Sequence, residues 1–247
     1  MKAIILAAGE AKRLRPITEH IPKCMLFVGE KRIIDYQLSN LREAGITEIV
    51  FVLGFKAEII RDHVNENYSN FKFTFLTNPD YSTTNPAYSL WLAKDFLIEG
   101  ALYLNADVIC HPEIIGRIIS YPHDSVTALQ KTSWEEEEVN IILDLKNHRV
   151  LELGKHIQKE QSFGEFIGVT KISTSFASTL ISVLEEFITQ KELKKFAADA
   201  LNVTIQRGQK LFALDVSEFP AIEIDTPEDY LKAEQKVASI DSTTTSS

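Results

Sequence analysis

The sequence predicts an α/β protein with a mixed, mostly parallel central sheet flanked by helices. Short apolar runs alternate with amphipathic stretches from the N-terminus to about residue 120, as in sheets whose parallel strands are joined by helices. From Ser125 the pattern becomes richer in strands, so we expect them to complete a mixed sheet. With 45% hydrophobic residues among 247, the chain can bury a large core without disulfides.

The first half of the chain contains four apolar runs suited to buried strands, at residues 3–7, 48–53, 72–76 and 101–105. The stretches between them carry apolar side chains at helical spacing. These are Ile33, Ile34, Leu38 and Leu41 in the first stretch, Ile59, Ile60 and His63 in the second, and residues 88–93 at the start of a third helix.

The second half predicts shorter strands at residues 126–129, 140–145, 150–153, 165–172 and 210–215, with a hairpin turn at 147–148. Helices are expected at 176–189 and 195–207. After the apolar segment 221–224, Thr226, Pro227 and Asp229 carry helix-start signals, which places Asp225 between a strand and a helix. We assign residues 1–238 to one domain and the Ser- and Thr-rich residues 239–247 to a disordered tail.

Charge and cysteine content exclude several classes of function. The net charge of −9 disfavours nucleic acid and anionic membranes as partners, so we expect a small substrate. Cys24 and Cys110 lie far apart without a CxxC spacing, so they are expected to be buried thiols. The apolar start is too short for a signal peptide or a membrane helix, and the protein is expected to be cytoplasmic, without membrane insertion.

The segment after the first strand has the composition of a polyphosphate site. Small residues at a strand-to-loop turn let backbone N–H groups approach an anion, and Arg13, Arg15 and Lys23 add positive charge. GxxxxGK[ST] is absent, and residues 9–14 hold one glycine where a dinucleotide fingerprint has three. A P-loop NTPase and an NAD dehydrogenase are therefore excluded.

This segment resembles the opening of the nucleotidyltransferase family, which joins an NTP to a phosphorylated sugar or alcohol. The family signature L-A-A-G-x-G-x-R-L-x-P-x-T followed by P-K is matched at Leu6, Ala7, Ala8, Gly9, Arg13, Leu14, Pro16, Thr18, Pro22 and Lys23. The resemblance covers nearly all of the ordered chain and implies a Rossmann-like nucleotidyltransferase fold. The second glycine of the signature is Ala11; if its φ is positive, alanine costs on the order of 1 kcal/mol there.

The resemblance implies that the acceptor phosphate attacks the α-phosphorus of the NTP and releases pyrophosphate. Arg13 then holds the triphosphate, Lys23 compensates charge at the α-phosphate, and residues 6–9 bind the nucleotide. Asp107 and Asp225 follow predicted strands and match the metal-binding aspartates of the family, here for Mg²⁺. Taken singly, each residue has a simpler alternative: Lys23 as a solvated surface lysine, Asp107 as a turn residue and Asp225 as a helix cap.

The loop at residues 83–91 looks like that of the phosphocholine cytidylyltransferase branch, which shares Asn-x-x-x-Ser-Leu. CTP is therefore the favoured nucleotide, and Asn85 and Ser89 are candidate contacts, although Asn-Pro is equally a turn and Ser a helix start. Candidate acceptor contacts are Lys155, Glu165 and Trp134, the last beside the acidic run 135–138. Each has a simpler alternative: Lys155 as a solvent-facing charge, Glu165 as an edge-strand carboxylate, and the acidic run beside Trp134 as a solvated face.

Three functions remain open. The leading hypothesis is a Mg²⁺-dependent cytidylyltransferase acting on a small phosphorylated alcohol or amino-alcohol. Ala197 and Ala198 stand where the choline enzymes tend to carry Tyr-Trp, so a polyol phosphate also remains open. The alternatives are a sugar-1-phosphate nucleotidyltransferase using UTP, GTP or dTTP, and a non-catalytic nucleotide-sensing scaffold. The sequence does not predict the oligomeric state.

Overall fold

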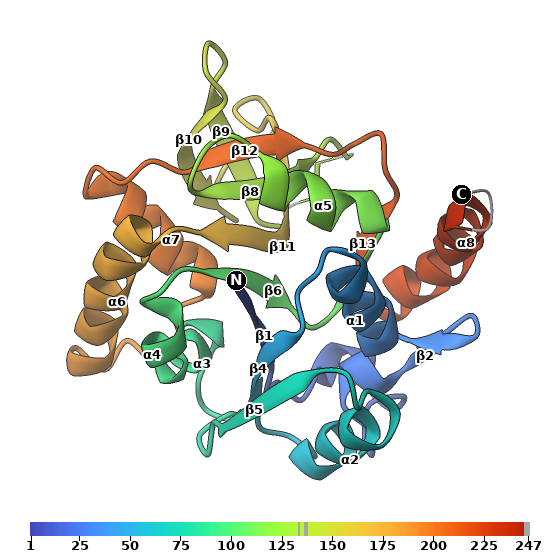
Figure 1. Cartoon of the computed structure of the whole chain (residues 1–247). Helices are drawn as coiled ribbons and strands as arrows, with labels where there is room; N and C mark the ends of the chain where they lie inside the picture. The colour runs from blue at the N-terminus through green and yellow to red at the C-terminus, as the bar shows by residue number, and fades with distance from the viewer. Residues whose placement is uncertain (133, 136–137, 245–247) are drawn as a thin grey trace.

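The computed structural model describes residues 1–132, 134–135 and 138–244, and within them one mixed sheet organises the fold (Figure 1). Its strands are β1 (Lys2–Ala7), β4 (Glu48–Leu53), β5 (Lys72–Thr77), β6 (Ala101–Asn105), β8 (Val126–Gln130), β9 (Asn140–Asp144), β10 (Arg149–Gly154), β11 (Gly164–Ile172) and β12 (Phe212–Asp215). They lie in the order β5-β4-β1-β6-β11-β8-β12-β10-β9. Two short antiparallel pairs lie outside this sheet: β2 (Phe27–Val28) with β3 (Lys31–Arg32), and β7 (Val108–Cys110) with β13 (Ala221–Glu223).

The prediction of a mixed α/β sheet is confirmed, with a smaller share of parallel pairing than expected. β1 pairs in parallel with β4 and β6, and β4 pairs in parallel with β5. In the second half only β12 and β8 are parallel; β11 runs antiparallel to β6, β8 and β9, and β10 runs antiparallel to β9 and β12. Short connections such as the turn between β9 and β10 force antiparallel neighbours, whereas parallel ones need a crossover.

Helices cover both faces of the sheet. They are α1 (Ile33–Glu43), α2 (Ala57–Asn67), α3 (Pro86–Leu92), α4 (Lys94–Leu97), α5 (Pro112–Ser120), α6 (Thr174–Thr189), α7 (Ala197–Gln206) and α8 (Pro227–Thr244). Side chains alternate along the buried strands, so Ile5 and Phe51 pack with α1, α2 and α5, while Ile4 and Val50 pack with α3, α4, α6 and α7. Figure 1 shows α3, α4, α6 and α7 together on one side, with α1 and α2 on the other.

Helix α8 packs over a third apolar cluster beside the main sheet. Ala233, Val237 and Ile240 of α8 are buried with Ile222 and Ile224. The disordered tail predicted for residues 239–247 is corrected up to Thr244, because the helix continues to that residue; residues 245–247 lie outside the described residues. Burial of Ile240 stabilises this last part of the helix. This packing outweighs the weak helix propensity of the neighbouring Ser and Thr residues.

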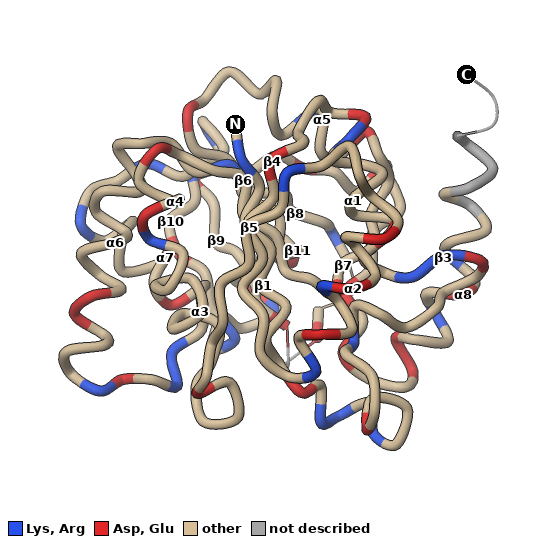
Figure 2. The backbone as a smooth tube through the Cα atoms, turned by 60° about the horizontal axis from the view of Figure 1, so that its bottom comes forward, with Lys and Arg blue, Asp and Glu red and all other residues tan. Residues whose placement is uncertain are grey.

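Several short elements were not predicted. The strands β2, β3 and β7 span only two or three residues, too few for a periodic pattern. Helix α5 was also not predicted, although its start carries two signals. The His111 side chain accepts a hydrogen bond from Glu113 N, and Pro112 is the first residue of the helix. Among the described residues, no helix has the length and apolarity needed to cross a membrane. Figure 2 shows acidic and basic residues interspersed around the outside, while the central strands carry few charges.

Candidate active site

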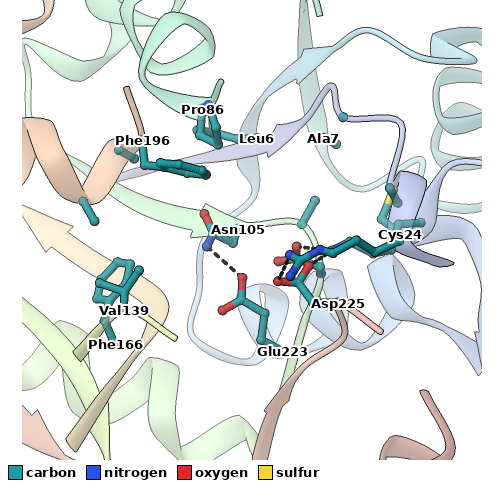
Figure 3. Close-up of a pocket in the computed structure, with 18 of the residues that line it drawn as sticks. Leu6, Ala7, Cys24, Pro86, Asn105, Val139, Phe166, Phe196, Glu223 and Asp225 are labelled. Atoms are coloured by element: carbon teal, nitrogen blue, oxygen red, sulfur yellow. Dashed lines mark hydrogen bonds and ion pairs between the residues drawn. The ribbon is translucent and has the colours of Figure 1, made fainter. Parts of the chain in front are cut away.

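A cavity of about 240 Å³ lies where β1, β6 and β13 end (Figure 3). The end of β1 and the loop after it supply Leu6, Ala7, Gly9, Ala11 and Arg13 to its wall. Other parts of the wall come from later in the chain, including the ends of β6 and β13 and the starts of α3 and α7. Strands that end at one edge of an open α/β sheet commonly form the ligand site there, so the fold brings the predicted phosphate loop and both predicted metal ligands to one place.

The phosphate loop is held in a strained backbone conformation at Ala11. Its φ of 48° and ψ of 50° lie in the left-handed region, which favours glycine because a Cβ crowds the backbone. The buried Thr18 hydroxyl donates to Ala11 O at 2.8 Å, and Leu14 N donates to the same oxygen at 3.0 Å. The backbone at this position therefore has the positive φ at which alanine is costly.

Lys23 lies between the two predicted metal ligands. Its Nζ is 2.5 Å from Asp107 Oδ2 and 2.6 Å from Asp225 Oδ1, and only 15% of its side chain is exposed. The buried neighbours Cys24 and Met25 anchor the short helical turn on which it lies. Burial disfavours the ammonium ion, but the two carboxylates outweigh burial and hold the pKa of Lys23 above its usual range. Lys23 is thus a fixed positive charge at the centre of the site.

Asp225 is shared between two cations. Arg13 NH2 contacts its Oδ2 at 2.6 Å while Lys23 contacts Oδ1. Burial alone would raise the pKa of Asp225, but Lys23 and Arg13 lower it below its usual value. Asp229 fixes the backbone here, because its Oδ2 accepts from Asp225 N at 3.2 Å and from Thr226 N at 2.8 Å. The predicted helix start after Asp225 is therefore also what holds this carboxylate in place.

One oxygen of Asp107 is unpaired within the part of the chain that the structure describes. Its Oδ1 is buried and has no hydrogen-bond partner there. The turn that presents it is fixed by Gln37, whose Nε2 donates to Asn105 O at 2.7 Å and to Val108 O at 2.9 Å. Buried oxygens without a partner are costly, and carboxylate oxygen is the ligand that Mg²⁺ prefers. Asp107 and Asp225 therefore fit a hard divalent cation.

Beside this ion-pair network lies a second acidic group, the carboxylate cluster Glu138, Glu165 and Glu223. One side-chain oxygen from each lies within 4.8 Å of the others. Burial, with the neighbouring Glu165 and Asp225, raises the pKa of Glu138 to about 7. Burial also raises the pKa of Glu165, and burial with Asp107 and Asp225 raises that of Glu223. Ionisation of these three carboxyl groups is therefore disfavoured, and a cation bound among them would stabilise their ionised forms.

The sequence reasoning did not single out Glu138 or Glu223. The acidic run 135–138, which includes Glu138, was considered as one solvated face. Residues 136 and 137 of this run lie outside the described residues. The signal for Glu223 was its place at the end of a strand, two residues before Asp225, because side chains at i and i+2 of extended backbone lie on the same face.

Apolar side chains close the other end of the cavity. Phe196 and Pro86 lie on one side, and Val139 and Phe166 lie across from them (Figure 3). Lys155, a predicted acceptor contact, also lines the cavity, with its Nζ 5.6 Å from the centre of the Phe196 ring. Ala197 and Ala198 contribute small side chains to the wall. This end can accommodate the carbon skeleton of a small acceptor.

Some predicted residues do not line the cavity: they are Ala8, Asn85, Ser89, Trp134 and Glu165. Ser89 is buried and accepts from Asn78 Nδ2 at 3.1 Å, and Asn85 Nδ2 donates to Lys194 O at 2.6 Å. Trp134 Nε1 donates to Ile157 O at 3.2 Å. These three side chains support loops in this structure, whereas Glu165 reaches the site through the carboxylate cluster.

Comparison with known proteins agrees with this geometry. The model of the family described as nucleotidyl transferase matches residues 2–140. CTP:phosphoglutamine cytidylyltransferase of Campylobacter jejuni is 30% identical over 200 residues, which cover 75% of this chain and 78% of that protein. Choline-phosphate cytidylyltransferase of Streptococcus pneumoniae is 27% identical over 242 residues, or 95% of this chain and 97% of that protein.

A solved structure shows the same fold. The inositol-1-phosphate CTP transferase of T. maritima superposes with a TM-score of 0.83 at 21% identity, covering 97% of this chain and 95% of that one. The mixed sheet with helices on both faces is therefore the architecture of these enzymes.

Proposed function

Because the chain belongs to the nucleotidyl transferase family, we propose that it is a Mg²⁺-dependent cytidylyltransferase that joins CTP to a small phosphorylated amino-alcohol or alcohol. An oxygen of the acceptor phosphate forms a bond to the α-phosphorus, the bond from this phosphorus to the β-phosphate oxygen breaks, and pyrophosphate leaves. The observation that carries the proposal is Lys23 Nζ lying within 2.6 Å of both Asp107 and Asp225 beside the phosphate loop.

The reaction brings two anions together and builds up further negative charge at phosphorus. Lys23 is held charged, and Arg13 lies next to it through their shared partner Asp225. We assign Lys23 to the α-phosphate and Arg13, whose side chain is half exposed, to the outer phosphates. Ala7 and Gly9 line the same cavity, where their backbone N–H groups can orient the triphosphate.

Asp107 and Asp225 would hold the Mg²⁺. When bound, this ion neutralises phosphate charge and aligns the attacking and leaving oxygens. The two aspartates are paired with Lys23 in the free protein, so the lysine offsets the repulsion between these neighbouring carboxylates. This charge balance explains why Lys23 and Arg13 lie in direct contact with the two aspartates.

CTP as the nucleotide is supported by the relatives. The C. jejuni and S. pneumoniae proteins are named as cytidylyltransferases, and the T. maritima structure as a CTP transferase. Other relatives include a UTP--glucose-1-phosphate uridylyltransferase of Haloferax volcanii at 24% identity, so a sugar-1-phosphate acceptor is the second candidate. A nucleoside triphosphate substrate agrees with the cytoplasmic location expected from the sequence.

The carboxylate cluster favours an acceptor with a primary ammonium group. Since the three oxygens of Glu138, Glu165 and Glu223 lie within 4.8 Å of one another, a nitrogen at their centre lies no more than about 2.8 Å from each, which is hydrogen-bond distance. A primary ammonium has three N–H donors for three carboxylates. A quaternary ammonium has none and is bound by aromatic faces instead. We therefore propose an amino-alcohol phosphate as the preferred acceptor.

The test is pyrophosphate release from purified protein with Mg²⁺ and CTP, UTP, GTP or dTTP. Acceptors are phosphoethanolamine, phosphocholine, inositol-1-phosphate and glucose-1-phosphate; the first two differ only in N-methylation. We expect turnover with CTP, highest with phosphoethanolamine and abolished by EDTA. A preference for glucose-1-phosphate with UTP, GTP or dTTP would instead support the sugar branch. Nucleotide binding without turnover of any acceptor would support the scaffold.

A further inference from the structure

The side chain of Asn105 connects the interior of the sheet to the carboxylate cluster. Asn105 ends β6, and its Oδ1 accepts a hydrogen bond from the hydroxyl of Tyr103, two residues earlier on the same strand. Its Nδ2 donates to Glu223 Oε1 at 3.3 Å (Figure 3). Tyr103 is 1% exposed, so the far end of this chain of hydrogen bonds is fixed in the core.

The carboxamide has one acceptor end and one donor end. Because the Tyr103 hydroxyl occupies the oxygen, the amide N–H groups face Glu223. The backbone of Asn105 is held as well, since Gln37 Nε2 donates to Asn105 O at 2.7 Å. The position of the amide is therefore set by Gln37 and its orientation by Tyr103.

Gly168 on the neighbouring strand makes room for this amide. Its φ is +68°, and a Cβ at this position would lie 2.6 Å from Asn105 Nδ2 and 2.8 Å from Asn105 Cγ. The pairing of β11 with β8 is irregular at this point, between Phe166 and Thr170. A side chain at Gly168 would be strained in its backbone and would also displace the amide.

We propose that Asn105 is a positioning residue that acts through Glu223, and that Tyr103 and Gly168 set its orientation. This inference rests on the proposed function, in which Glu223 binds the ammonium group of the acceptor. The N–H donated by Asn105 holds the Glu223 carboxyl toward Glu138 and Glu165 against their mutual repulsion. Without it the carboxyl turns away, and the acceptor loses one of its three partners while the nucleotide keeps all of its contacts.

The experiment measures KM for phosphoethanolamine and for CTP separately in Tyr103→Phe and Gly168→Ala. We expect the acceptor KM to rise about tenfold in each, the effect of one charge-assisted hydrogen bond, while the CTP KM stays within about twofold. Selectivity for phosphoethanolamine over inositol-1-phosphate should fall to the same extent. Tyr103→Phe keeps the test decisive if Gly168→Ala does not fold.

Thr127→Val is the matched control. It also removes a buried hydroxyl, which donates to Val169 O at 3.2 Å and pairs with Thr170 Oγ1 at 2.9 Å on β8 and β11, but it does not line the cavity. Its acceptor KM should not change. If the wild-type enzyme used no amine acceptor, the proposed function itself would fail. If it did and the acceptor KM of Tyr103→Phe were unchanged, or rose together with that of CTP, the positioning role would be refuted.

Discussion

Replacing Lys23 with methionine tests the centre of the site, because methionine keeps much of the side-chain length and removes the charge. Lys23 is the cation shared by Asp107 and Asp225, at 2.5 and 2.6 Å. Removing one partner of a buried ion pair costs about 3–5 kcal/mol. Arg13 still compensates Asp225, so we expect a loss of about 2–3 kcal/mol in unfolding free energy. For a chain of this size that lowers Tm by roughly 5–10 °C.

The turnover of Lys23→Met should fall by more than the loss of folding stability alone would cause. Loss of one group that stabilises transition-state charge typically lowers kcat by about 10²–10³. Mg²⁺ can replace the ammonium between the two aspartates, so saturating Mg²⁺ should recover most of the Tm and none of the rate. Thermal melts at increasing Mg²⁺ and pyrophosphate release at saturating CTP measure the two effects separately.

Lys12→Met is the matched control for this prediction. Lys12 lies on the same loop, pairs with Glu10 at 2.7 Å and has 60% of its side chain exposed, so its loss should change stability by less than about 0.5 kcal/mol and turnover by less than about twofold. Turnover of Lys23→Met within about threefold of wild type would refute the assignment of Lys23 to the α-phosphate.

Two further predictions follow from Ala11 and Glu138. Ala11→Gly removes the strain at φ 48° and should stabilise the protein by about 0.5–1 kcal/mol after the entropy gained by the unfolded chain; an unchanged urea midpoint would contradict this. The pKa of Glu138 near 7 means that the folded protein binds a proton which the unfolded chain releases above about pH 4.5, so stability should fall as pH rises from about 4.5 to 7. Since an ammonium group needs the ionised carboxylate, the acceptor KM should fall as pH rises through 7. Glu138→Gln should weaken both dependences and leave the part that Glu165 and Glu223 contribute.

The sheet was predictable wherever a strand is buried on both faces. The runs at residues 48–53 and 101–105 are nearly all apolar, and they form β4 and β6 within the predicted bounds. Helix α5 was missed although Ile114, Ile115 and Ile118 form one buried face. The strand order of the second half was not predictable, because β12 inserts between β8 and β10 by contacts that no local pattern encodes.

The site was predictable to the extent that its residues lie in contiguous motifs. The phosphate loop, Lys23 and the strand-end aspartates were all placed near one another by sequence reasoning, and the structure brings them into contact. The hydrogen bond from Asn78 to the Ser89 hydroxyl was not predictable, because Asn78 lies eleven residues earlier, in the loop before helix α3. The carboxylate cluster depends on three separate elements, so only the folded chain reveals it.

The ion pair between Lys23 and Asp225 joins positions 202 residues apart. A chain emerging from the ribosome therefore displays its phosphate loop long before the partner carboxylate has been synthesised. During that interval Lys23 and Arg13 lack Asp225, and the loop can attract phosphate compounds without the means to turn them over. The complete site forms only after residue 225 has emerged, which couples assembly of the site to docking of helix α8, the element that follows Asp225.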